Sequence, residues 1–232
     1  MLRELVAEPV FGILLTLVAY EAGIFIYNRT KTSLLHPVPV GILLVIGFLL
    51  LFKIDLASYQ VGGEVIQLFL GPVTVVLAIP LYRQTKALKR HLIPVLVGVF
   101  SGVLTGVLVV IFLAQWFKLP QELLLSLVPK SVTTPIGVEI ARNLGGSMAL
   151  AAAGIIMTGI LGAIIGPGVC RLLKIKNKVA VGIAIGTASH AIGTSRALEL
   201  GEEQGAFSSL AIGLAGLFTV ALAPLLINWV VK

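Results

Sequence analysis

The sequence has little charge and almost no cysteine. Only 12% of its 232 residues are charged, whereas 58% are hydrophobic and the mean hydropathy is +1.07. This composition lies far from that of a soluble domain, and the apolar runs approach the length of a bilayer span, which indicates an integral membrane protein. The single cysteine, Cys170, excludes an intrachain disulfide and says nothing about the redox compartment.

Motifs of known enzyme classes are also missing. There is no GxSxG elbow, no HExxH motif and no pair of carboxylates in a soluble domain, so we expect neither an enzyme nor a cofactor. His36 and His91 lie beside basic residues without a partner at ligand spacing, which argues for loop histidines rather than a metal site. The 17 basic residues form short clusters without interleaved aromatics, which argues against nucleic acid.

The apolar runs predict an all-α membrane protein with about six transmembrane helices. Their approximate bounds are 9–27, 37–52, 65–82, 92–117, 147–170 and 207–231, and the third should kink at Gly71-Pro72 and Pro80. The first run is long enough to remain as a span, so no secretory signal is expected. Basic loops at 28–31, 83–91 and 171–178 belong inside by the positive-inside rule, which predicts a multi-pass protein of the cytoplasmic membrane with its N-terminus outside.

Two features of the spans leave alternatives open. Glu21, near a basic loop, is either a functional intramembrane acid or a locally paired one, and local pairing is the more common case. Glycines at 98, 102, 106, 162 and 166 permit close helix packing, either within the chain or in a homodimer.

Residues 121–143 do not fit a simple crossing. The preceding span should end outside, while the following span meets a basic loop that belongs inside, so this segment must begin and end outside. A re-entrant hairpin of two half-helices, broken at the polar stretch Pro129–Pro135, satisfies this condition. Its first arm, residues 121–128, would reach about 12 Å into a hydrocarbon core roughly 30 Å thick.

A second hairpin is expected at residues 179–204, broken at the polar stretch Gly186–Ser195. A hairpin followed by a span then occurs twice with opposite starting sides, an inverted repeat typical of secondary transporters. We therefore divide the single membrane domain into N-terminal scaffold helices, residues 1–120, and a transport region, residues 121–232. The alternative is that residues 179–200 cross completely.

Both breaks are candidate binding sites, because irregular backbone at membrane depth is tolerated only inside protein or around a cavity. Each returning arm would begin at its break, capped by Thr134 before Pro135 in one case and by Thr194 or Ser195 in the other. The positive ends of two helices would then face the midplane and favour a small carboxylate. The candidate substrate-binding residues are Lys130, Ser131, Thr133, Thr134, Ser189, His190, Gly193, Thr194, Ser195 and Arg196.

Several of these residues also have a purely structural interpretation. Lys130 is either a ligand contact or a cation that neutralises the carbonyls ending the first arm. The hydroxyls could serve only freed backbone groups, and His190 could be a satisfied interior histidine. Proton coupling through His190, Glu139 or Glu199 is a hypothesis, since either glutamate could merely stabilise the first turn of a helix.

Two strings carry a family resemblance. PKSVTTPI at Pro129–Ile136, with Glu139 after it, and HAIGTSRA at His190–Ala197, running through Glu199 to GAFS at 205–208, resemble the LrgB/CidB family of bacterial membrane proteins, also called YohK-like. The resemblance covers essentially the whole chain. Glu21 departs from the usual pattern and gains no support from it.

The resemblance implies two alternative functions. One is an antiholin-like or holin-like role that modulates murein hydrolase activity and cell lysis with a small LrgA/CidA-type membrane partner. The other is transport of small monocarboxylates, implied by related plastid glycolate and glycerate carriers and bacterial pyruvate carriers. We favour transport, because a pore-forming holin does not need two polar breaks with opposed helix N-termini.

The position of the C-terminus tests the two hairpins. They place Lys232 outside, whereas a full crossing of residues 179–200 places it inside. A topology reporter fused after Lys232 is expected to give the outside signal. A cytoplasmic signal would contradict the two-hairpin topology.

Overall fold

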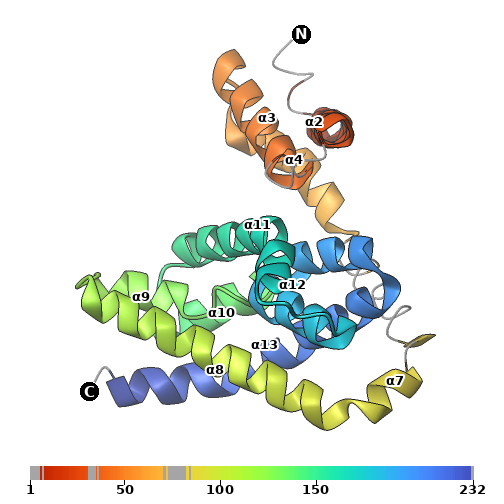
Figure 1. Ribbon diagram of the computed structural model, residues 1–232. Helices are drawn as coiled ribbons and strands as arrows, with labels where there is room; N and C mark the ends of the chain where they lie inside the picture. Colours follow the sequence, from red (N-terminus) through yellow and green to blue (C-terminus); the bar gives the residue numbers. More distant parts are fainter. Residues whose placement is uncertain are drawn as a thin grey trace. The chain divides into compact units, whose positions relative to one another are not determined.

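The chain folds into helices wherever its structure is described. The computed structural model describes residues 6, 8–30, 35, 37–69, 72, 82–83 and 85–230, and every regular element in them is a helix (Figure 1). Four helices are long and apolar enough to cross a membrane: Pro9–Thr30, Leu92–Trp116, Met148–Leu172 and Glu202–Trp229. The chain is thus an all-helical, multi-pass membrane protein, as its composition predicts.

The chain divides into two compact units, residues 1–76 and 77–232. The first contains α2 (Pro9–Thr30), α3 (Pro37–Phe52) and α4 (Leu56–Gln67). The second contains α7 (Thr85–Arg90), α8 (Leu92–Trp116), α9 (Gln121–Leu127), α10 (Thr134–Leu144), α11 (Met148–Leu172), α12 (Lys178–Leu200) and α13 (Glu202–Val230). From the sequence we grouped α8 with the scaffold helices. Its contacts instead place it in the same unit as the helices that follow it.

Glycine lets α2 and α4 pack backbone to backbone. A Cβ at Gly62 would lie 2.6 Å from the Cα of Gly12, and one at Gly12 would lie 2.9 Å from the Cα of Gly62. The hydroxyls of Thr16 and Tyr59 share a hydrogen bond of 2.8 Å across the same contact. In lipid, the hydrophobic effect does not drive helices together, so membrane helices commonly associate through close van der Waals packing at small residues.

The first two predicted spans coincide with helices, α2 being long enough to cross a membrane and α3 a shorter apolar helix, but α4 was missed. It begins at Leu56, because the Asp55 carboxylate caps it by accepting a hydrogen bond from Ala57 N at 3.2 Å. The predicted third span at 65–82 overlaps α4 only at its start. Gly71 and Pro80, where this span was expected to kink, lie outside the described residues, as does His36.

A valine stripe on α8 anchors the second unit. Val95, Val99, Val103 and Val107 are buried at four-residue spacing and belong to one core with the buried Phe207 of α13. Four-residue spacing places these side chains on one face of the helix. A flanking face of the same helix, which carries Gly98, Gly102 and Thr105, lines a cavity.

The first break joins two short helices. Helix α9 has seven residues and α10 has eleven, and residues 128–133 between them form turns closed by Lys130 N to Leu127 O at 3.1 Å and Val132 N to Pro129 O at 3.2 Å. The hydroxyl of Ser126 donates to Glu122 O at 2.6 Å and accepts from Ser147 N at 2.8 Å, which ties α9 to the start of α11.

The second break lies at His190, where φ is 41° and ψ is −138° within α12. A Cβ at Gly182 would lie 3.1 Å from the carbonyl carbon of Gln204, and one at Gly186 would lie 2.8 Å from the Cα of Ser208. From the first contact to the second, the residue number rises by four on both helices. The first arm of α12 and the start of α13 therefore run in the same direction. The residues between His190 and Gly201 therefore carry the chain back to the end where α12 began.

The capping predictions were wrong at both breaks. The N-cap of α10 is Thr133 rather than Thr134, and its side chain makes no capping hydrogen bond. At the second break the irregular residue is His190, whereas Thr194 and Ser195 lie inside the following helix with their hydroxyls bonded to carbonyls of the preceding turn, His190 O and Ile192 O. Such bonding satisfies a hydroxyl without a helix end. Helix α13 also begins at Glu202, five residues before the predicted 207.

The neighbouring glycines of α4 offer a matched pair of variants. Gly62→Ala would force apart the α2 and α4 backbones, and we expect a destabilisation of about 1–3 kcal/mol. Gly63→Ala, whose added Cβ meets nothing within 4 Å, should be neutral or slightly stabilising because alanine favours helix. Thermal unfolding in detergent measures both, and equal melting temperatures would contradict the close contact.

Candidate functional site

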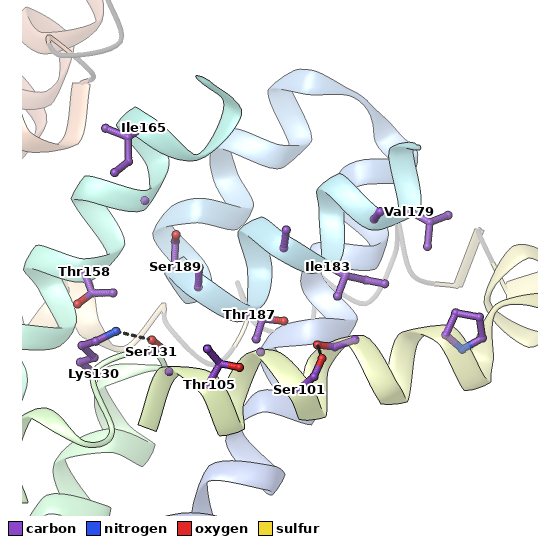
Figure 2. A pocket seen from close by; sticks show the side chains of 18 of the residues that line it. Ser101, Thr105, Lys130, Ser131, Thr158, Ile165, Val179, Ile183, Thr187 and Ser189 are labelled. Atoms are coloured by element: carbon purple, nitrogen blue, oxygen red, sulfur yellow. Dashed lines mark hydrogen bonds between the residues drawn. The ribbon is translucent and has the colours of Figure 1, made fainter. Parts of the chain in front are cut away.

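The second unit holds a large cavity in which the two breaks meet. Its volume is about 1090 Å³, just above the usual range of ligand sites, and α8, α11, the first arm of α12 and the first break all line it. Lys130 and Ser131 come from the first break and Ser189 from the second (Figure 2). The structure thus brings together two polar stretches that lie about 55 residues apart in the sequence.

Lys130 carries the formal positive charge of this cavity. Its Nζ donates to the hydroxyl of Ser131 at 3.2 Å, and the side chain lies near Thr158 of α11 in Figure 2. Among the described lining residues there is no aspartate or glutamate. A lysine ammonium can donate three hydrogen bonds, so donors remain for a ligand. This arrangement suits an anion.

Helix α11 holds the second break through its backbone and its glycines. His190 Nε2 donates to the carbonyl of Ile155 at 2.9 Å. A Cβ at Gly159 would lie 2.8 Å from that nitrogen, and a Cβ at Gly162 would lie 2.6 Å from Ser189 Cβ. The Cδ1 atom of Ile155 also lies against Gly137 of α10, so one residue contacts both broken elements. His190 therefore lies behind the cavity wall, where it positions Ser189.

Four hydroxyls of the cavity were missed by sequence reasoning. Ser101 and Thr105 come from α8, Thr158 from α11 and Thr187 from α12. Thr187 is buried, and its Oγ1 has no hydrogen-bond partner among the described residues, which leaves it available to a water or a ligand in the cavity. The sequence held one signal for the two α8 hydroxyls. Ser101 and Thr105 lie one helical turn apart, and each directly precedes a glycine of the row on α8.

The other predicted binding residues do not line the cavity. Thr133 and Thr134 start α10, and Gly193 packs beneath Ser189. Thr194 is fully buried, where its hydroxyl donates to His190 O at 2.9 Å and shares a bond of 2.7 Å with Ser208 Oγ. Ser195 is exposed on the second arm of α12.

The charged candidates form ion pairs along their own helices. Arg196 is bonded to Glu199 three residues later. Glu139 is bonded to Arg142 at 2.6 Å. Neither glutamate lines the cavity, and proton coupling through them or His190 stays a prediction. Among the described residues no group of three or more His, Cys, Asp or Glu side chains could hold a metal ion.

Most glycines of the two rows make contacts within the chain, whereas a Cβ at Gly106 would meet nothing within 4 Å. A Cβ at Gly98 would lie 3.5 Å from Ile183, and one at Gly102 would lie 2.8 Å from the methyl group of Thr187. On α11, Gly162 meets the break and a Cβ at Gly166 would lie 3.7 Å from Ile185. These contacts let α8 and α11 approach α12 around the cavity, so the expectation of a homodimer draws no support from them.

His91 lies in a turn, as predicted for a loop histidine, but it is not fully solvated. It is half-buried, it precedes α8 and it lines one end of the cavity. Its ring meets Phe207 edge to face, with centroids 6.2 Å apart. The cavity therefore reaches from the first break to the loop that carries His91.

Broken helices around a cavity that carries polar groups, set among long apolar helices, are features of multi-pass membrane proteins with discontinuous helices. The chain belongs to the LrgB-like family, whose sequence pattern matches residues 16–229. This confirms the resemblance carried by the two polar strings.

Curated relatives match along nearly their whole length. The chain is 38% identical to protein YxaC of Bacillus subtilis (strain 168), over 93% of this chain and 94% of that protein. It is 32% identical to the antiholin-like protein LrgB of the same strain, over 97% and 98%, and 31% identical to the antiholin-like protein LrgB of Bacillus cereus (strain B4264), over 96% and 97%. No solved structure matches significantly.

Two neighbouring hydroxyls of α12, one buried and one exposed, test whether buried hydrogen bonds stabilise the second break. Thr194→Val removes two buried hydrogen bonds at nearly constant volume, and we expect a destabilisation of about 1–3 kcal/mol. Ser195→Ala, at an exposed position, should stay within about 0.5 kcal/mol of the parent protein. Thermal unfolding in detergent checks both, and an unchanged Thr194→Val would mean that these bonds do not hold the break.

Proposed function

We propose that the protein is a secondary transporter of small monocarboxylates of the pyruvate, glycolate or glycerate class. The observation that carries this proposal is the cavity in which Lys130 and a set of hydroxyls converge from two broken elements with no acidic residue among the described lining. A carboxylate would bind the ammonium, and a neighbouring hydroxyl or keto oxygen would bind serine and threonine hydroxyls. Transport rather than covalent chemistry is the activity proposed.

The proposed topology has six spans and two re-entrant hairpins in the cytoplasmic membrane, with the N-terminus outside. Four long apolar helices and the shorter apolar helix Pro37–Phe52 support it. Helices α9 and α10 are too short to cross alone. The parallel run of Gly182 and Gly186 beside Gln204 and Ser208 supports a return at His190.

An inverted repeat in residues 121–232 forms part of the proposal. The broken pair α9 and α10 is followed by the long apolar helix α11, and the broken α12 is followed by the long apolar α13. Repeats of opposite orientation commonly place discontinuous helices at the bilayer midplane, where substrates bind. The convergence of both breaks on one cavity supports this arrangement.

A second candidate is an antiholin-like function with an LrgA/CidA-type membrane partner, favoured by the names of two relatives. A holin-like pore would release solutes of many sizes, whereas a transporter binds its substrate saturably. The cavity, with Lys130 and several hydroxyls in a largely apolar lining, favours transport. A requirement for the small partner is compatible with either activity.

Uptake by the purified protein tests the proposal. Proteoliposomes are expected to take up labelled pyruvate, glycolate or glycerate saturably, without leakage of a dye. Lys130→Ala should weaken apparent affinity by about 10- to 150-fold, the loss expected for a hydrogen bond to a charged group. Lys118→Asn is the control, because it removes an exposed lysine outside the cavity at a position of positive φ that asparagine tolerates.

The other outcomes are distinct. Size-graded dye leakage that Lys130→Ala does not change would support the holin-like function and overturn transport. Uptake that appears only after co-reconstitution with an LrgA-type protein would support transport by a two-component system. Absence of uptake in both preparations would contradict the proposal.

A further inference from the structure

We infer that the cavity is an anion-selective access path from the cytoplasmic end of the chain to Lys130, and that the structure shows the state open to that side. The inference rests on the proposed function for its substrate, but not for its geometry. Three observations carry it: where the cavity runs along each helix, what replaces it beyond Lys130, and which charges surround its end.

The cavity occupies only one half of each long element. On α8 its lining runs from His91 to Gly106, about 22 Å of helix, and on α12 from Asn177 to Ser189. On α11 it covers residues 158–165, in the half that leads to the basic loop after Leu172. The lining of all three helices therefore extends from the breaks toward the same end, where the basic loops lie.

Polar lining does not continue past the first break. Residues 107–114 of α8 are all apolar, and the buried members Val107, Val110, Ile111 and Ala114 share a core with Leu124 and Val128 near the first break. A carboxylate cannot cross such a layer without losing its hydration, which costs several kcal/mol or more. This apolar half of α8 closes the site from the opposite side.

The open end has a cationic mouth, formed by Arg90, His91, Asn177 and Lys178. His91 and Asn177 line the cavity, and the exposed Arg90 and Lys178 are their chain neighbours. An ion pair of 3.9 Å from Lys178 to Glu203 joins the starts of α12 and α13 at this end, and one of 3.9 Å from Glu202 to Arg83 adds the chain just before α7. By the positive-inside rule this end faces the cytoplasm.

A charge-lined passage changes the local concentration of ions according to their sign. Lys130 at its inner end and the basic residues at the mouth would enrich small anions and repel small cations. The lateral rim contributed by α11 is instead apolar, with Leu161 52% and Ile165 54% exposed. An ion therefore reaches Lys130 through the mouth rather than across this rim.

Thiol labelling tests the path without any transport assay. Cys170→Ala removes the only cysteine, and Ala188→Cys then places a thiol in the cavity beside the second break, at an exposed position. A membrane-impermeant methanethiosulfonate reagent is expected to modify it at least tenfold faster in inside-out than in right-side-out vesicles. Gln121→Cys, at the exposed start of α9, should show the reverse preference.

The sign of the reagent tests selectivity. After normalisation to a small thiol in solution, the sulfonate reagent should modify Ala188→Cys about tenfold faster than the trimethylammonium reagent. Adding Lys130→Gln or Lys178→Gln should reduce this ratio. Modification of Ala188→Cys at equal rates from both sides, or preferentially from outside, overturns the inferred state, and a ratio of one overturns anion selectivity. Either result can occur whether or not uptake is found, so failure of the path and failure of the proposed function remain distinguishable.

Discussion

The packing of the α12 break against α11 is the contact on which the candidate site depends. A break within the membrane frees backbone groups that lipid cannot satisfy. Here Thr194 Oγ1 bonds the carbonyl of His190, and the histidine ring bonds the carbonyl of Ile155. Gly159 and Gly162 supply the space in which His190 and Ser189 fit. The polar wall of the cavity exists because this break is held from behind.

Helix α8 divides the environment of the site along its length. Its first half pairs small residues with hydroxyls, Ser101 beside Gly102 and Thr105 beside Gly106, on the side facing α12. Its second half is aliphatic and continues the core. One helix thus supplies both the polar surface that a carboxylate needs and the apolar layer that stops it, so the length of the polar half sets the depth of the site.

Hydropathy predicted the long spans well, because lipid imposes a minimum length on apolar runs. The charge of the loops then located both broken segments, but not the residue at which the second one breaks. Thr194 and Ser195 have the composition of a helix cap, yet the same hydroxyls can bond a carbonyl one turn back inside a helix. Ser101 and Thr105 were missed because isolated hydroxyls in an apolar helix are common, and only the fold shows that these two face a cavity.

The contacts of Gly182 and Gly186 with α13 constrain how the site can change its access. These contacts are made mainly by backbone atoms, which cannot change rotamer to absorb a displacement. Rotation of the first arm of α12 about its own axis would separate them. These contacts therefore favour movement of the first arm of α12 together with the beginning of α13 in the proposed transport cycle.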